Sequence, residues 1–252
     1  MNMNGTQRSG DSYAVVGGVG GAGATRLSVE FAATLARAGR DVAVIDTAFA
    51  TQGLSAFVPE RIEPDVTRVL TDDRPLAEAE TRLALDTPGS VTVAPARAPF
   101  ERLARAKTSE CARRLADRLS SATDRYDAVF LDVPPVGANQ AVAAVTAADT
   151  VALAVPDSER GSDAVPRTRD RLADVDAAVD AVVANFAGED RRVEAADAVV
   201  PTADATALST APAPVGPTEF AVAVASAVEA VTGADLDLPE PESSSMADYL
   251  PG

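Results

Sequence analysis

The 252-residue sequence contains no histidine, no tryptophan and a single cysteine, Cys111. One cysteine cannot form an intrachain disulfide, and protein zinc sites are built mainly from cysteine and histidine ligands. We therefore expect neither a structural disulfide, nor zinc, nor haem.

Basic residues are also scarce. Lys107 is the only lysine, and 22 lysines and arginines stand against 38 aspartates and glutamates, which gives a formal net charge of −16. A surface of this charge repels phosphates and anionic lipids, so it argues against DNA binding and membrane binding.

Alanine, valine, aspartate and threonine are abundant, and this composition resembles that of haloarchaeal proteins. We predict a halophilic protein whose melting temperature rises from low to molar potassium chloride. Counterions at molar concentration shorten the Debye length to about 3 Å and screen the repulsion among surface carboxylates. Thermal unfolding across a potassium chloride series measures this. A melting temperature that is flat or falls would contradict the adaptation to salt.

Targeting signals and long apolar runs are missing too. The first twelve residues lack the basic and apolar regions of a signal peptide, and no uncharged apolar run reaches 18 residues. We expect a cytoplasmic protein with a disordered N-terminus over residues 1–12, one domain over 13–233, and an acidic, flexible tail over 234–252. The tail is broken by prolines and lacks the basic amphipathic helix of a membrane anchor.

Short apolar runs alternate with longer amphipathic ones, which predicts a doubly wound, mostly parallel sheet of about seven strands with helices on both faces. The expected strands are Tyr13–Val16, Asp41–Asp46, Val91–Ala94, Ala128–Asp132, Thr150–Val155, Ala181–Asn185 and Ala198–Val200. The expected helices are Thr25–Ala38, Glu110–Ser121, Gln140–Ala147, Ser162–Val175 and Pro217–Val231. The segment from Ala50 to Pro88 has charges and prolines that break the periodicity.

A glycine-rich loop lies between the first strand and the first helix, and two motifs fit it. Gly18, Gly20 and Gly23 satisfy the dinucleotide fingerprint G-x-G-x-x-G. Gly18, Gly23 and Thr25 satisfy the phosphate loop G-x-x-x-x-G-K-[ST] in everything except its lysine. Either motif lets backbone N–H groups approach a phosphate at a helix N-terminus.

Acidic residues at two strand ends discriminate between these motifs. Asp46 ends the second strand 23 residues beyond the last glycine, later than the ribose-binding acid of a dinucleotide fold. Asp132 ends a buried strand and precedes a double proline. A phosphate-loop enzyme places an aspartate there to hold the magnesium of Mg-ATP, whereas a dinucleotide fold gives Asp132 no role.

Together these segments resemble the ParA/MinD-like deviant Walker A ATPases. The glycine loop, with Gly21 among its residues, matches the family's phosphate loop; Val44-Ile45-Asp46 matches its second acidic motif, and the strand ending at Asp132 its Walker B strand. Weaker matches place Asn185 at the residue that reads adenine, and Asp204 in the loop that closes over the base. The resemblance spans residues 14–231 and implies the P-loop NTPase fold.

The resemblance also implies the site's chemistry. Thr25 and Asp132 would hold Mg²⁺, and Asp46 and Asp132 are the candidate catalytic residues, Asp46 by orienting the attacking water. ATP or ADP with Mg²⁺ is the expected ligand.

Both lysines of the family's loop are missing, however. Val19 stands at the signature position and Ala24 at the P-loop position. These lysines stabilise charge on the phosphates, so we expect a pseudoenzyme with weak or absent hydrolysis. Arg26 is a candidate substitute cation. The second acidic residue that the family often carries is replaced by Ala48.

The resulting hypothesis is a ParA/MinD-like protein of cell division, chromosome partitioning or positioning of cellular machinery. It would act with a protein partner or a paralogue, as a homodimer or a heterodimer. Two alternatives stay open: a dinucleotide-binding (Rossmann) oxidoreductase, and a nucleotide-free scaffold.

Overall fold

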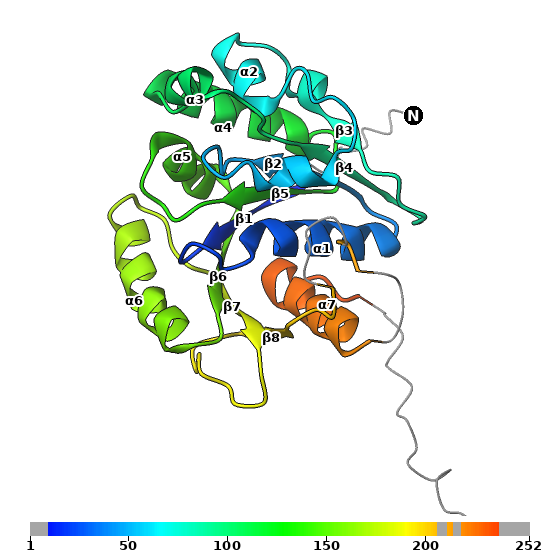
Figure 1. Ribbon diagram of the computed structural model, residues 1–252, viewed down its shortest axis with the longest axis vertical. Coiled ribbons are helices and arrows are strands. Elements are labelled where there is room, and N and C mark those ends of the chain that lie inside the picture. Colours follow the sequence, from blue (N-terminus) through cyan, green and yellow to red (C-terminus); the bar gives the residue numbers. More distant parts are fainter. Residues whose placement is uncertain (1–9, 206–210, 214–217, 237–252) are drawn as a thin grey trace, which may run out of the picture.

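Eight strands form one sheet in the order β3-β4-β2-β5-β1-β6-β7-β8 (Figure 1). The computed structural model describes residues 10–205, 211–213 and 218–236. The strands are β1 (Asp11–Gly17), β2 (Asp41–Asp46), β3 (Thr81–Arg82), β4 (Ser90–Ala94), β5 (Ala128–Val133), β6 (Thr150–Pro156), β7 (Ala181–Ala187) and β8 (Ala198–Pro201). All seven expected strands are present, and all neighbours pair in parallel except β3, which pairs antiparallel with β4. The predicted doubly wound fold is confirmed.

Helices cover both faces of the sheet. The α-helices are α1 (Ala24–Arg37), α2 (Val66–Thr71), α3 (Phe100–Ala106), α4 (Ser109–Thr123), α5 (Asn139–Ala147), α6 (Glu159–Ala173) and α7 (Glu219–Thr232). Two 3-10 helices, η1 (Gly53–Phe57) and η2 (Leu76–Ala79), lie in the segment where the periodicity was broken. The α1 and α7 helices pack together on one face, whereas α4, α5 and α6 lie on the other (Figure 1).

Each face has its own apolar core, because the central strands are buried on both sides. Val16, Ile45 and Leu131 pack under α4 and α5, and their neighbours Val15, Val44 and Phe130 pack under α1. This alternation explains why the strands read as continuous apolar runs in the sequence. In the part of the chain that is described, no helix has the length and apolar character needed to cross a membrane.

The chain ends agree with the expected boundaries only in part. Asp11 and Ser12 belong to β1 rather than to an N-terminal tail. Residues 1–9 and 237–252 lie outside the described residues, so the expected N-terminal disorder and the acidic tail stay predictions. Pro217, the expected start of the last helix, is also outside them.

Candidate functional site

The glycine loop joins the end of β1 to the start of α1, at the carboxyl edge of the sheet. The N–H of Gly18 donates to the carbonyl of Ala154 at 2.8 Å, which fixes the loop to β6. A side chain at Gly18 would clash with Val155, whereas Gly20 and Gly21 have open space where a Cβ would stand. The backbone at Gly20 and Gly21 is therefore accessible, as the approach of a phosphate requires.

Gly23 is the N-cap of α1 and has a φ of 84°, in the left-handed region. A Cβ there would lie 2.3 Å from Nδ2 of Asn185 and 2.9 Å from Cζ of Phe186. Both the backbone conformation and the close packing against the end of β7 thus require glycine.

We predict that Gly23→Ala lowers the free energy of unfolding by about 1–3 kcal/mol, because alanine is strained at this φ and clashes with Asn185. Gly20→Ala is the matched control, since its Cβ would meet nothing within 4 Å. Urea unfolding of both variants measures the difference. Equal stability of the two variants would show that the loop relaxes around the added methyl group.

Asp132 and Asp46 lie opposite each other on the paired strands β5 and β2. Asp132 is 1% exposed, and its Oδ2 has no hydrogen-bond partner among the described residues. Burial raises the pKa of Asp132 to about 6, although a hydrogen bond with the side chain of Thr25 acts in the opposite direction. Thr25 and Asp132 thus meet at one point, as a shared magnesium site requires.

Asp46 is completely buried. Its Oδ1 accepts the N–H of Ala48 at 2.9 Å, and its Oδ2 accepts the N–H of Ala96 at 3.2 Å. Burial raises its pKa well above the usual value, with the charge of Asp132 adding to the effect, while the backbone N–H groups lower it. The carboxylate holds the loops that follow β2 and β4, so its predicted role in orienting water stays a prediction.

A cavity of about 370 Å³ opens over the glycine loop. Thr25, Ala48, Asp132 and the double proline Pro134-Pro135 line it together with the loop. Arg26 is the only lysine or arginine among the described lining residues.

The guanidinium of Arg26 is held on the other side of the first turn of α1. Its Nε donates to Glu30 at 3.3 Å, and its Nη1 donates to the carbonyl of Ala205 at 2.5 Å. The group also lies 5.5 Å from the ring centroid of Phe220. These contacts place the charge beside residues 205 and 220, so the role of Arg26 as a substitute cation for phosphate stays a prediction.

Two further cavities, of about 450 and 100 Å³, adjoin Arg26 and share Pro201 and Phe220. Asp204 lines the larger and Asn185 the smaller. Asn185 is buried, and its Nδ2 donates to the carbonyl of Ala22 at 3.0 Å while its Oδ1 accepts the N–H of Phe186. Its amide therefore braces the glycine loop. Contact of Asn185 with adenine, and closure of the loop that carries Asp204 over the base, stay predictions.

Sequence reasoning missed two aromatic residues that line these cavities, Phe186 and Phe220. Phe186 has a φ of 60° at an irregularity of β7 and is 41% exposed. Its position directly after the strand-terminal Asn185 was the available signal. The sequence pattern gives Phe220 as an ordinary residue of an amphipathic helix, so no signal identified it as a cavity-lining residue.

A family model described as an AAA domain matches residues 12–178. The chain belongs to the AAA domain family. The match covers the glycine loop, Asp46 and Asp132, and it favours the phosphate-loop interpretation over the dinucleotide one. A search of curated proteins gave no match.

Solved structures share the fold of this AAA domain chain. The cell division ATPase MinD of Pyrococcus furiosus superposes with a TM-score of 0.73 at 21% identity, over 88% of this chain and 98% of that one. The septum site-determining protein MinD of Pyrococcus horikoshii, complexed with Mg-ADP, gives 0.70 at 18% identity, over 87% and 94%. The MinC:MinD cell division protein complex of Aquifex aeolicus gives 0.70 at 18% identity, over 92% and 99%. The AAA domain chain is thus ParA/MinD-like in fold.

Proposed function

We propose that this protein is a ParA/MinD-like, nucleotide-binding protein of cell division, chromosome partitioning or cellular positioning, with weak or absent ATP hydrolysis. One observation carries the proposal. The glycine loop and the contact between Thr25 and Asp132 are intact, but no lysine stands at Val19 or Ala24, and Arg26 is paired with Glu30. The backbone that binds phosphate is kept, and the cations that stabilise a transferring phosphate are not.

The residues present offer ligands for magnesium and open backbone for a nucleotide phosphate, but they lack the two lysines of the family's loop. The unpartnered Oδ2 of Asp132 and the hydroxyl of Thr25 are oxygen ligands of the kind that Mg²⁺ prefers. Open backbone at Gly20 and Gly21 suits a phosphate. Bound Mg²⁺ would neutralise phosphate charge, and Thr25 and Asp132 would hold it.

A protein partner is part of the proposal. MinD is found in a complex with MinC in the structure from Aquifex aeolicus. For this chain we propose a homodimer, or a heterodimer with a paralogue that carries the loop lysines. In the heterodimer, the signature lysine of the paralogue would supply the positive charge that is missing at Val19.

Calorimetric titration of the full chain with ATP, ADP and NAD, in molar potassium chloride with Mg²⁺, tests the proposal. We expect ATP and ADP to bind and NAD not to bind. Binding of NAD alone would instead support the dinucleotide alternative. Absence of binding by all three would support the nucleotide-free scaffold.

A further inference from the structure

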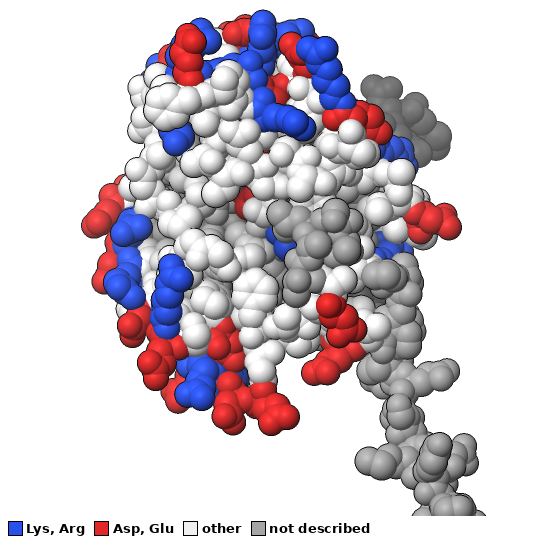
Figure 2. All heavy atoms as spheres, viewed as in Figure 1, with Lys and Arg blue, Asp and Glu red and all other residues white. Residues whose placement is uncertain are grey.

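The basic residues of this acidic chain are unevenly distributed. Residues 59–126 contain 12 of the 22 lysines and arginines, together with 12 acidic residues, so the net charge of −16 comes entirely from the rest of the sequence. On the face drawn in Figure 2, blue side chains gather at the end that carries α2 and α3. An anion approaching this end meets less repulsion than elsewhere.

A cavity of about 480 Å³ opens at this end, between the loop that leads into α2 and the segment that leads into α3. Its volume is in the range of small-molecule sites. It shares no lining residue with the cavity over the glycine loop. Four arginines line it: Arg61, Arg68, Arg97 and Arg102.

The floor of the cavity is built on Asp65, which is buried. Its carboxylate accepts the N–H of Arg68 at 3.1 Å, the N–H of Arg97 at 2.7 Å and the hydroxyl of Thr67 at 2.8 Å. Arg102 lies 3.0 Å from the same carboxylate and also donates to Thr67 and to the carbonyl of Arg97. Asp65 thus joins the two segments and fixes Arg102, and its accepting capacity is used internally.

The remaining arginines are held weakly. Arg61 pairs with Glu63, two residues further along the chain, and the two side chains are 87% and 53% exposed. Arg68 pairs with Asp72 on the surface of α2. Arg97 has no ion pair and no side-chain hydrogen bond within the described ranges. Exposed pairs of this kind contribute little and are readily exchanged for a ligand.

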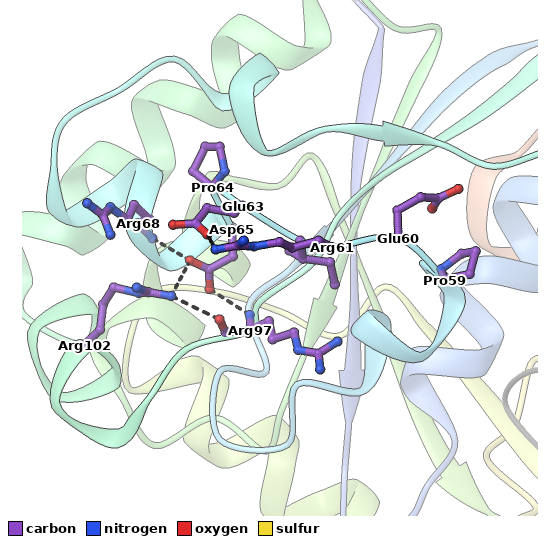
Figure 3. Close-up of a pocket in the computed structure, with 10 residues that line it drawn as sticks. Pro59, Glu60, Arg61, Glu63, Pro64, Asp65, Arg68, Arg97 and Arg102 are labelled. Atoms are coloured by element: carbon purple, nitrogen blue, oxygen red, sulfur yellow. Dashed lines mark hydrogen bonds and ion pairs between the residues drawn. The ribbon is translucent and has the colours of Figure 1, made fainter.

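In Figure 3, Arg61 and Arg102 reach toward Asp65 and Glu63 from two sides of the cavity, while Arg68 and Arg97 extend from its edge. The carboxylate of Glu63 therefore occupies the place where an external anion would meet Arg61. A ligand that displaces Glu63 would find Arg61 and Arg102 beside it, with Arg97 within the same lining.

We propose that this cavity is a second anion site, and that it binds the phosphoryl group of a small molecule. Planar guanidinium groups match phosphate oxygens in a bidentate manner, and a phosphoryl dianion offers three oxygens to arginines on different segments. The lining carries four arginines against three acidic residues, an excess of one charge, so it suits a compact dianion. A nucleic acid requires many neutralised phosphates and would meet the acidic remainder of the surface.

Calorimetric titration of the full chain with inorganic phosphate and with glycerol 3-phosphate tests this site. We expect saturable binding by at least one of the two, and their relative affinities tell free phosphate from a phosphomonoester. The double variant Arg61→Gln/Arg97→Gln should weaken binding at least 10-fold. Glu63→Gln should strengthen it several-fold, because the internal competitor is removed.

Arg113→Gln is the matched control, since Arg113 is an exposed arginine on α4 that pairs with Glu110, outside the cavity. Its affinity should equal that of the wild type. Four results would overturn the proposal: no saturable binding, equal weakening by Arg113→Gln, binding indifferent to the double variant, or citrate bound as tightly as both phosphate ligands. Indifference to the double variant would place the bound phosphate elsewhere, and tight citrate binding would indicate a carboxylate site.

Discussion

Ala24→Lys should tighten ATP binding by about 10- to 100-fold, the range expected for one hydrogen bond to a charged group. Ala24 is the first residue of α1 and lines the cavity over the glycine loop. A lysine there could bury its aliphatic stem and extend its ammonium group toward bound phosphates. Asp132 lines the cavity, and the guanidinium of Arg26, which also lines it, is engaged by Glu30 and Ala205, so the gain from one further cation should be large.

Turnover should respond differently from affinity. A lysine at position 24 contacts phosphates in the ground state as well as the transition state, and uniform binding does not raise the rate of the chemical step. We expect wild type and Ala24→Lys to hydrolyse ATP at or near background. The double variant Val19→Lys/Ala24→Lys should be the first to improve turnover, since one missing electrostatic stabiliser typically costs about 100- to 1,000-fold in rate.

ATP affinity and single-turnover hydrolysis, measured for the wild type, both single variants and the double variant, check this prediction. Ser120→Lys on α4 adds the same charge at an exposed position away from the loop and should change neither quantity. Wild-type hydrolysis well above background would show that Arg26 or another group already supplies the charge. A double variant that still binds no ATP would show that the cavity does not accept nucleotide.

The architecture was predictable where the sequence pattern is long. Strands such as Ala128–Val133 are apolar except for Asp132 near the carboxyl end, because both faces are covered, and α1 combines a long apolar face with a glycine N-cap. The segment from Ala50 to Pro88 was not predictable, because α2 has six residues and β3 has two. An amphipathic period cannot be recognised over so short a length.

The candidate site shows the same limit at the level of single side chains. The family resemblance implied that Thr25 and Asp132 would meet, and strand order supports this because the glycine loop and Asp132 follow neighbouring parallel strands that share one edge. The sequence could not show that Asn185 donates to Ala22, nor that Arg26 turns toward Glu30 and Phe220. Those contacts depend on segments more than 150 residues apart in the chain, or on a choice of side-chain rotamer.

Asp132→Asn should stabilise the protein at pH 7, by up to about 3 kcal/mol, because burial raises the pKa of the Asp132 carboxyl to about 6. The folded protein binds the Asp132 proton with a pKa of about 6, whereas an unfolded aspartate has a pKa near 3.9. Between these values the folded state holds more protons, so this group's contribution to stability is full below about pH 4 and is lost as the pH rises through 6. Asparagine has nearly the same shape as aspartate and does not ionise, so Asp132→Asn removes the cost of burying an ionised carboxylate.

The difference in unfolding free energy between Asp132→Asn and the wild type should therefore grow from about pH 4 to pH 6 and then level off. Urea unfolding at a series of pH values, in constant potassium chloride and without Mg²⁺, measures it. Asp163→Asn is the matched control, because the side chain of Asp163 is 77% exposed on α6 and this substitution removes one carboxylate that is not buried. Added Mg²⁺ should raise the melting temperature of the wild type and not that of Asp132→Asn, since the buried carboxylate is the ligand that the variant loses. If Asp132→Asn instead destabilised the protein at every pH, the ionised carboxylate would be satisfied by contacts beyond Thr25, and its unpartnered Oδ2 would no longer support a magnesium site.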